Sequence, residues 1–280
     1  MKVISALLLS GSALLAQTPT LEPVLKAELA FAKLAEEKGI RTAFLASLTE
    51  DARVFTPRMI SAKAQYGPEP GDSGHLVWYP EAMGLAASGD LAWSLGPWTY
   101  AMKKGGPVLV NGHFLSMWQK QADGAWKVEA DIGVPHGAPE TPARCFEAGK
   151  GASAPGRALP PDATVALRQK EAALSAAWRL KGGTVLVPEL AREARLLRPR
   201  SFPLGETAAI QRALEADRPG STWEVPRVHV APSGDLGWTC GETGPDDQGR
   251  TASFLRVWIL EGTDWKVLFD VRLPHPPSPK

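Results

Sequence analysis

Apolar residues recur first at helical spacing and then at alternating spacing along the first half of the chain. An apolar stripe beginning at Leu21 predicts a helix over residues 19–38, and a shorter helical pattern covers residues 42–48. Alternating patterns predict strands at residues 52–58, 76–87, 91–103, 108–121 and 125–134. Gly105-Gly106 and Asp123-Gly124 mark the hairpin turns between the last of these strands. Helices before a run of hairpins predict an α+β domain whose helices cover one face of a curved sheet.

The same order of motifs recurs in the second half. Residues 88–93 read Ser-Gly-Asp-Leu-Ala-Trp and residues 233–238 read Ser-Gly-Asp-Leu-Gly-Trp. Two later phrases recur as well, Leu115-Ser116-Met117-Trp118 as Leu255-Arg256-Val257-Trp258, and residues 126–131 as residues 265–270. Helices are predicted from Asp162 to residue 181 and over residues 207–216. The repeat therefore predicts two domains, residues 20–136 and 162–275, joined by a linker of Gly, Ala and Pro at residues 137–161.

The N-terminus predicts export. Residues 1–16 combine Lys2 with an apolar run that is too short to span a bilayer but suits the core of a signal peptide. The alternative, a buried N-terminal helix, is disfavoured because the run has no polar face. We therefore expect a periplasmic or secreted protein that has no membrane segment after signal removal. Cys145 and Cys240 do not form a disulfide framework, and Cys240 matches the inward position of Leu95, which favours a buried free thiol.

Charge and motifs exclude several classes of function. The formal net charge of +1 over 280 residues provides no field for nucleic acid or an anionic membrane. The chain has no zinc-type cysteine or histidine spacing, no glycine-rich phosphate loop and no nucleophile elbow. We therefore expect no nucleic-acid partner, no metal and no cofactor.

The repeated phrases carry a resemblance to a known family. Residues 87–91, residues 118–121 and the phrase Asp-Gly-Ala-Trp-Lys-Val at residues 123–128 are similar to motifs of the nuclear transport factor 2-like superfamily. They are most similar to its SnoaL-like branch called domain of unknown function 4440. The resemblance covers residues 21–136 strongly and residues 162–275 more weakly. These are turn-and-strand signatures, so they are specific for fold and weak for chemistry.

The resemblance implies an α+β fold of two cone-shaped domains, each with N-terminal helices packed on a curved antiparallel sheet. The interior of such a cone is often a small-molecule pocket, and members include isomerases, dehydratases, cyclases and non-catalytic binding modules. Two domains in one chain suggest an intramolecular pseudo-dimer with the two sheets packed together. The paired inward carboxylate and tyrosine of ketosteroid isomerase find no clear match, so none of the family's catalytic residues is carried over.

Strand alternation selects the candidate residues. On the last strand Val128, Ala130 and Ile132 match apolar residues of the repeat, which assigns this parity to the core face. Asp131 has the opposite parity, so we expect a surface or interface ion pair rather than a general base, unless a bulge reverses its direction. His113 has the inward parity of its strand and is our candidate acid or base. A core histidine bonded to a backbone carbonyl is the competing interpretation.

Aromatic residues complete the expected site. A pocket for a small apolar ligand is predicted from Trp78, Trp93, Trp98, Tyr100 and His113, with Tyr100 orienting a substrate for His113. Aromatic residues that only fill a core or a domain interface are the alternative. The sequence thus predicts an exported protein that binds a small molecule or serves as an interaction module. An isomerase, dehydratase or cyclase-like enzyme using a pocket in the first domain is the second hypothesis, and the sequence does not decide between them.

Overall fold

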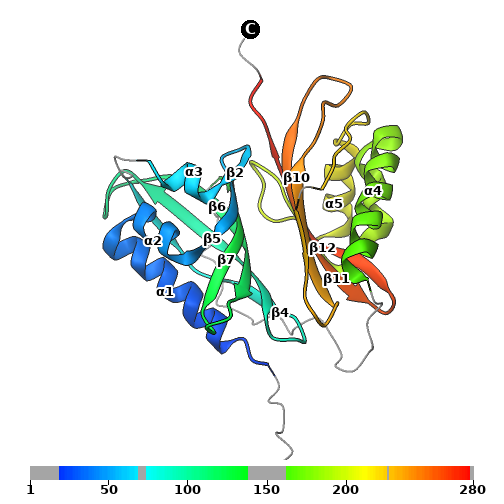
Figure 1. The fold of residues 1–280 in the computed structure, drawn as a ribbon. Coiled ribbons are helices and arrows are strands. Elements are labelled where there is room, and N and C mark those ends of the chain that lie inside the picture. Colours follow the sequence, from blue (N-terminus) through cyan, green and yellow to red (C-terminus); the bar gives the residue numbers. More distant parts are fainter. Residues whose placement is uncertain (1–18, 69–73, 138–161, 226, 278–280) are drawn as a thin grey trace, which may run out of the picture.

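The computed structural model describes residues 19–68, 74–137, 162–225 and 227–277. The predicted signal peptide and nearly all of the predicted linker lie outside these residues. Within them the chain forms two α+β domains, each built from helices and one curved sheet (Figure 1). Of the helices in these ranges, none combines the length and apolar character needed to cross a membrane.

The first domain begins with its helices. They are α1 (Glu22–Lys38), α2 (Ile40–Ser47) and the short α3 (Ala62–Tyr66). Its strands are β1 (Leu48–Phe55), β2 (Met59–Ser61), β3 (His75–Trp78), β4 (Ala82–Leu85), β5 (Leu91–Ala101), β6 (Val108–Lys120) and β7 (Trp126–His136). The single strand predicted at residues 76–87 is thus two short strands. Pro80 lies between them and has no N–H to donate to a ladder.

The second domain repeats this order. Its helical segments are α4 (Ala163–Lys181), the 3-10 segment η1 (Gly182–Glu189) and α5 (Thr207–Glu215). Its strands are β8 (Leu190–Leu197), β9 (Arg227–Val230), β10 (Leu236–Glu242), β11 (Ala252–Glu261) and β12 (Asp264–Pro274). The side chain of Asp162 accepts a hydrogen bond from the backbone N–H of Val165 at 3.2 Å, as expected for a helix N-cap.

Both sheets are mixed rather than wholly antiparallel. The strand orders are β2-β1-β7-β6-β5-β3, with β4 also beside β5, and β8-β12-β11-β10-β9. The hairpin strands pair antiparallel as predicted, but β1 runs parallel to β7 and β8 runs parallel to β12. The parallel pair arises because the chain crosses from the first strand to the far edge of the sheet before the hairpins return to it.

The two sheets face each other, and the helices cover their outer faces (Figure 1). One hydrophobic core joins the domains across this interface; Trp93 of the first packs edge-on against Phe269 of the second, with 4.8 Å between ring centroids. The repeated turns also meet, because Ser88 Oγ lies 2.9 Å from Ser233 Oγ. Glu129 of the first domain accepts hydrogen bonds from His229 at 2.6 Å and from the indole of Trp238 at 3.2 Å.

Each sheet is therefore buried on both faces. A separate apolar core lies inside each cone, between the sheet and its own helices. Each domain therefore has one core of its own and shares the interface core with the other domain. In the last hairpin of each domain the register shifts, between the pairs Met117–Ala130 and Trp118–Val128 in the first domain. Glu129 is the extra residue of this β-bulge, which reverses the direction of the side chains that follow it.

Candidate functional site

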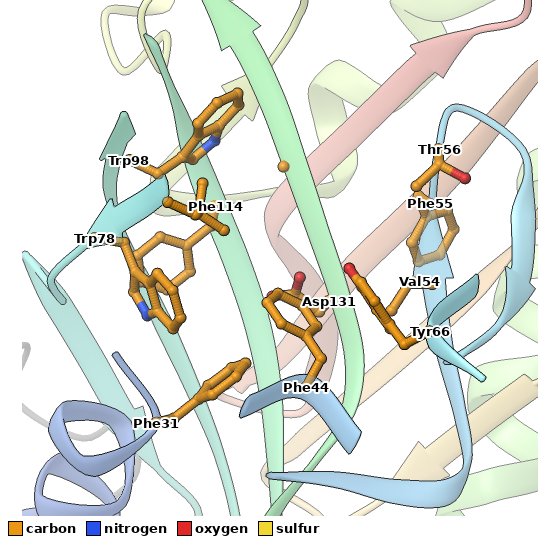
Figure 2. A pocket seen from close by; sticks show the side chains of 12 residues that line it. Phe31, Phe44, Val54, Phe55, Thr56, Tyr66, Trp78, Trp98, Phe114 and Asp131 are labelled. Carbon is orange, nitrogen blue, oxygen red and sulfur yellow. The ribbon is translucent and has the colours of Figure 1, made fainter. Parts of the chain in front are cut away.

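A cavity of about 190 Å³ lies inside the first cone, between the helices and the outer face of the sheet (Figure 2). Most of its wall is aromatic or aliphatic. The described residues that line it are Phe31, Phe44, Val54, Phe55, Thr56, Tyr66, Leu76, Trp78, Trp98, Phe114, Asp131 and Gly133. A mainly apolar hollow with a few polar groups is the usual form of a small-molecule site.

The helical side of the cavity is an aromatic cluster. Phe31 of α1 packs against Phe44 of α2 and against Trp78 of β3, with ring centroids 4.8 Å apart in both pairs. Phe44 also contacts Tyr66 of α3 at 4.4 Å. Edge-to-face pairs of this kind hold rings in fixed orientations, so the helices present a shaped wall to the cavity.

Asp131 is the one acidic residue among the described residues of the wall, and its side chain points into the cavity (Figure 2). The expectation that it forms a surface or interface ion pair is wrong. The bulge at Glu129 places Val128 and Asp131 on the cone side, while Ala130 and Ile132 enter the core between the domains. Alternation alone therefore gave the wrong face for the residues after the bulge.

The surroundings of Asp131 favour its protonated form. Burial raises the pKa of this carboxyl to about 6, although a hydrogen bond from Ser116 opposes the shift. Ser116 Oγ donates to Asp131 Oδ1 at 2.6 Å. No Lys, Arg or His is found among the described residues that line the cavity. Asp131 is thus a carboxyl in an apolar cavity that no cation of the wall neutralises.

A second carboxyl, Glu28 of α1, lies in the core beside this cavity. It is fully buried and accepts hydrogen bonds from Trp78 Nε1 at 2.7 Å, Ser94 Oγ at 2.5 Å and Trp118 Nε1 at 3.0 Å. Burial raises the pKa of Glu28 to about 7, and the charge of Asp131 adds to the rise. Glu28 fixes Trp78 from behind, so it shapes the cavity wall without lining it.

The predicted pocket residues are divided between two places. Trp78 and Trp98 line the cavity, and Figure 2 shows both rings at its wall. Trp93 lies in the core between the domains. Tyr100 is not among the described residues that line the cavity. Its ring lies against Gly74, since a Cβ added at Gly74 would be 2.5 Å from the ring.

His113 lies on the face toward the second domain, so its predicted position inside the cone is wrong. On β6, Phe114 and Trp118 enter the cone, and His113 has the opposite parity. His113 Nδ1 lies 2.6 Å from His136 Nε2, and its Nε2 lies 3.3 Å from Glu81. The competing interpretation, a bond to a backbone carbonyl, does not describe these contacts either.

Sequence reasoning placed one polar feature of the cavity on the wrong face and missed another. The first is Asp131, for which the neighbouring Ser116 and the repeated Asp270 were the available signals. The second is the indole N–H of Trp98, which is buried and lacks a hydrogen-bond partner among the described residues. The Trp98 Nε1 atom lies beside Gly133, since a Cβ added at Gly133 would be 3.3 Å from it. A bound molecule with an acceptor atom would satisfy this donor.

A second hollow lies in the second domain. This hollow of about 220 Å³ lies between η1, β8 and α5, and its described lining contains none of Asp270, Phe254 and Trp223, the counterparts of Asp131, Phe114 and Trp78. Among the described residues, no group of three or more His, Cys, Asp or Glu side chains is arranged to hold a metal ion. The cavity of the first cone is therefore the candidate functional site.

Comparisons with known proteins find likenesses only among solved structures. No protein-family model matches this chain, and no curated protein matches it. Its structural neighbours are nuclear transport factor 2-like and ketosteroid isomerase-like proteins. A ketosteroid isomerase-like protein from Erwinia carotovora atroseptica is 16% identical, with 42% of this chain and 97% of that chain covered and a TM-score of 0.35.

Two proteins of unknown function from Shewanella give similar values. The nuclear transport factor 2-like protein from Shewanella baltica is 11% identical over 40% of this chain and 96% of its own, with a TM-score of 0.32. That from Shewanella oneidensis is 17% identical over the same shares, with a TM-score of 0.32. With TM-scores below 0.5, these likenesses carry no conclusion about the function of this chain.

Proposed function

We propose that the protein is exported and binds a small, mostly apolar molecule in the cavity of its first cone. The observation that carries this proposal is the cavity itself, with its aromatic wall and the carboxyl of Asp131 inside it. A core that only stabilised the fold would gain by filling this space, because unfilled volume costs packing energy. The second cone supports the same conclusion, since two residues of the cavity wall, Thr56 and Gly133, correspond there to the larger Arg198 and Arg272.

The apolar wall supplies affinity and the polar groups supply orientation. Phe31, Trp78 and Phe114 offer flat surfaces against which a ring can pack. Asp131 and the indole N–H of Trp98 provide an acceptor and a donor at fixed positions. The ligand is therefore a molecule with an apolar body and a small number of polar atoms.

Native mass spectrometry of the purified protein, combined with thermal-shift screening of small hydrophobic metabolites, tests this function. Gly133→Leu places a side chain in the cavity, where the nearest atom to the added Cβ is 3.3 Å away. Gly244→Leu in the second domain is the matched control, because its added Cβ meets only ordinary contacts from 3.4 Å outward. We expect Gly133→Leu, and not the control, to lose the copurified or screened ligand. Equal ligand responses in wild type and Gly133→Leu would overturn the proposal.

A second candidate function rests on the pKa of Asp131. A carboxyl with a pKa of about 6 in a cavity can accept a proton near neutral pH, as the general base of an isomerase or dehydratase does. His113 and Tyr100 have no part in this version, because neither is among the described residues lining the cavity. Once a ligand is identified, Asp131→Asn should abolish its turnover. A variant that turns the ligand over at the wild-type rate would exclude this chemistry.

A further inference from the structure

The two cones of this chain share one acidic and aromatic frame. Glu171 of α4 accepts a hydrogen bond from the indole of Trp223 at 2.9 Å, as Glu28 does from Trp78 at 2.7 Å. The strand registers also correspond: Ser116 pairs with Asp131 and Arg256 pairs with Asp270. Likewise Phe114 pairs with Gly133 and Phe254 pairs with Arg272. These residues of the first cone therefore have identifiable counterparts in the second.

In the second cone the place beside this frame is filled by a guanidinium group. Arg256 donates from Nε to Asp270 Oδ1 at 2.6 Å and from Nη1 to Glu171 Oε2 at 2.8 Å. Its guanidinium carbon lies 4.7 Å from the ring centroid of Trp223 and 4.6 Å from that of Phe254. Aromatic faces and carboxylates together are the recognised surroundings of a buried cation.

Two more arginines complete the filling of the second cone. Arg198 donates to Asp270 Oδ2 at 2.5 Å, and Arg272 follows two residues after Asp270 on β12. Burial alone would raise the pKa of Asp270, but Arg198, Arg256 and Arg272 outweigh it and lower the pKa to about 2. The acidic group of this cone is thus held ionised by cations that belong to the chain.

The first cone keeps the carboxyls and the rings and lacks the cations. Ser116 stands where Arg256 would be, and by the same registers Thr56 and Gly133 stand at the positions of Arg198 and Arg272. Thr56 and Gly133 line the cavity, as do Trp78, Phe114 and Asp131. Small residues thus stand at all three arginine positions, and the carboxyl of the first cone is left without a cationic partner among the described residues.

From this comparison within one chain, we propose that the ligand of the first cone carries a cationic ammonium, amidinium or guanidinium group. This group lies against Trp78 and Phe114 and pairs with Asp131, in the place that Arg256 takes in the second cone. The proposal rests on the proposed function of the first cone as a binding site. It adds the chemical class of the ligand, an organic cation with an apolar body.

Asp131, rather than Glu28, forms the ion pair in this arrangement. Both oxygens of Glu28 already accept hydrogen bonds, and its Oε2 takes the indole N–H of Trp118 at 3.0 Å. Trp118 also donates to Ser94 at 3.0 Å, whereas the matching indole of the second cone, Trp258, donates to Thr239 and leaves Glu171 Oε2 to Arg256 and Trp223. In this arrangement the bound cation hydrogen-bonds to Asp131, and Glu28 contributes a nearby charge without a direct hydrogen bond.

Calorimetric titration with charged and neutral probes of similar shape tests this assignment. The probes are benzamidine and benzylamine as cations, benzyl alcohol as a neutral analogue and benzoate as an anion, all at pH 8. We expect the cations to bind about tenfold or more tightly than benzyl alcohol, because a charge-assisted hydrogen bond and a cation–π contact are added, and benzoate not to bind. Asp131→Asn should remove this preference, because the amide carries no charge to pair with the cations.

A second variant locates the site and does not depend on the folding of the first. Ser116→Arg rebuilds the counterpart of Arg256 beside Asp131, and we expect it to raise the thermal midpoint and to abolish binding of the cations. If benzyl alcohol binds as tightly as the cations in wild type, the cationic ligand is wrong and the binding function stands. If the cations bind Ser116→Arg with the same affinity as wild type, their charged group does not lie at the position that corresponds to Arg256. If neither the four probes nor the metabolite screen gives binding that Gly133→Leu removes, both proposals fall.

Discussion

A carboxyl buried in an apolar cavity should cost the protein stability when it is ionised, and Asp131→Asn measures that cost. The pKa of Asp131 is raised by burial from 3.8 to about 6. A difference of about two pKa units corresponds to about 3 kcal/mol of stability lost when the carboxyl is ionised. Asparagine has nearly the same shape and keeps an oxygen for the hydrogen bond from Ser116.

The sign of the effect follows from proton linkage. Because the folded protein holds the proton of Asp131 more tightly than the unfolded chain, the cost is absent below about pH 4 and grows between about pH 4 and pH 6. It is complete above about pH 6. Asp131→Asn should therefore have nearly wild-type stability at pH 4 and gain up to about 3 kcal/mol at pH 8. Part of this gain comes from Glu28, whose pKa the charge of Asp131 also raises.

Urea unfolding followed by tryptophan fluorescence, at pH 4 and pH 8, gives the two free energies of unfolding for each protein. Asp264→Asn is the matched control, since Asp264 is exposed at the start of β12 and the same change there should leave stability unaltered at both values. A gain that is equal at pH 4 and pH 8 would contradict the linkage argument. A loss at pH 8 would show that ionised Asp131 is satisfied by the fold itself.

Three further predictions concern the second cone and the interface. Arg256→Met should destabilise the protein by about 3 to 5 kcal/mol in urea unfolding, because the buried Glu171 loses its cation and Asp270 keeps only Arg198; an unchanged midpoint would refute the ion-pair role. Burial would lower the pKa of His229, but Glu129 outweighs it and raises the pKa. Glu129→Gln should thus lower the thermal midpoint more at pH 6 than at pH 9, and an equal loss at both would count against it. Burial raises the pKa of Cys240 to about 12, so mass spectrometry should find it unlabelled by a maleimide at pH 8 until urea is added.

The hairpins and helices could be predicted from sequence because their signals are local. Gly105-Gly106 and Asp123-Gly124 set the turns, and Asp162 caps its helix as expected. The split between β3 and β4 at Pro80 was not predicted, since apolar residues continue through it. At this break the chain passes close to β5, since a Cβ added at Gly96 would lie 2.0 Å from the backbone oxygen of Tyr79.

The face of the sheet that carries the site could not be read from alternation. One face packs on helices and the other on the second domain, so Trp118 and Met117 are both buried and apolar on opposite faces. Glu129 adds a bulge that no composition rule marks, and it turns Asp131 into the cone. A usable signal was Glu28, which lies on the apolar stripe of its helix. Glu171 occupies the same position in the second domain, and a glutamate that recurs at an apolar position indicates a buried acid.

The contact between Ser88 and Ser233 joins two positions that can be substituted independently in evolution. In a symmetric dimer of identical chains, one codon would specify both sides of such a contact, and every substitution would appear twice across the axis. Here two codons specify it, so either side can vary alone. The bulge residues show this freedom, since Glu129 is polar and bonded to His229 whereas its counterpart Leu268 lies in the shared apolar core.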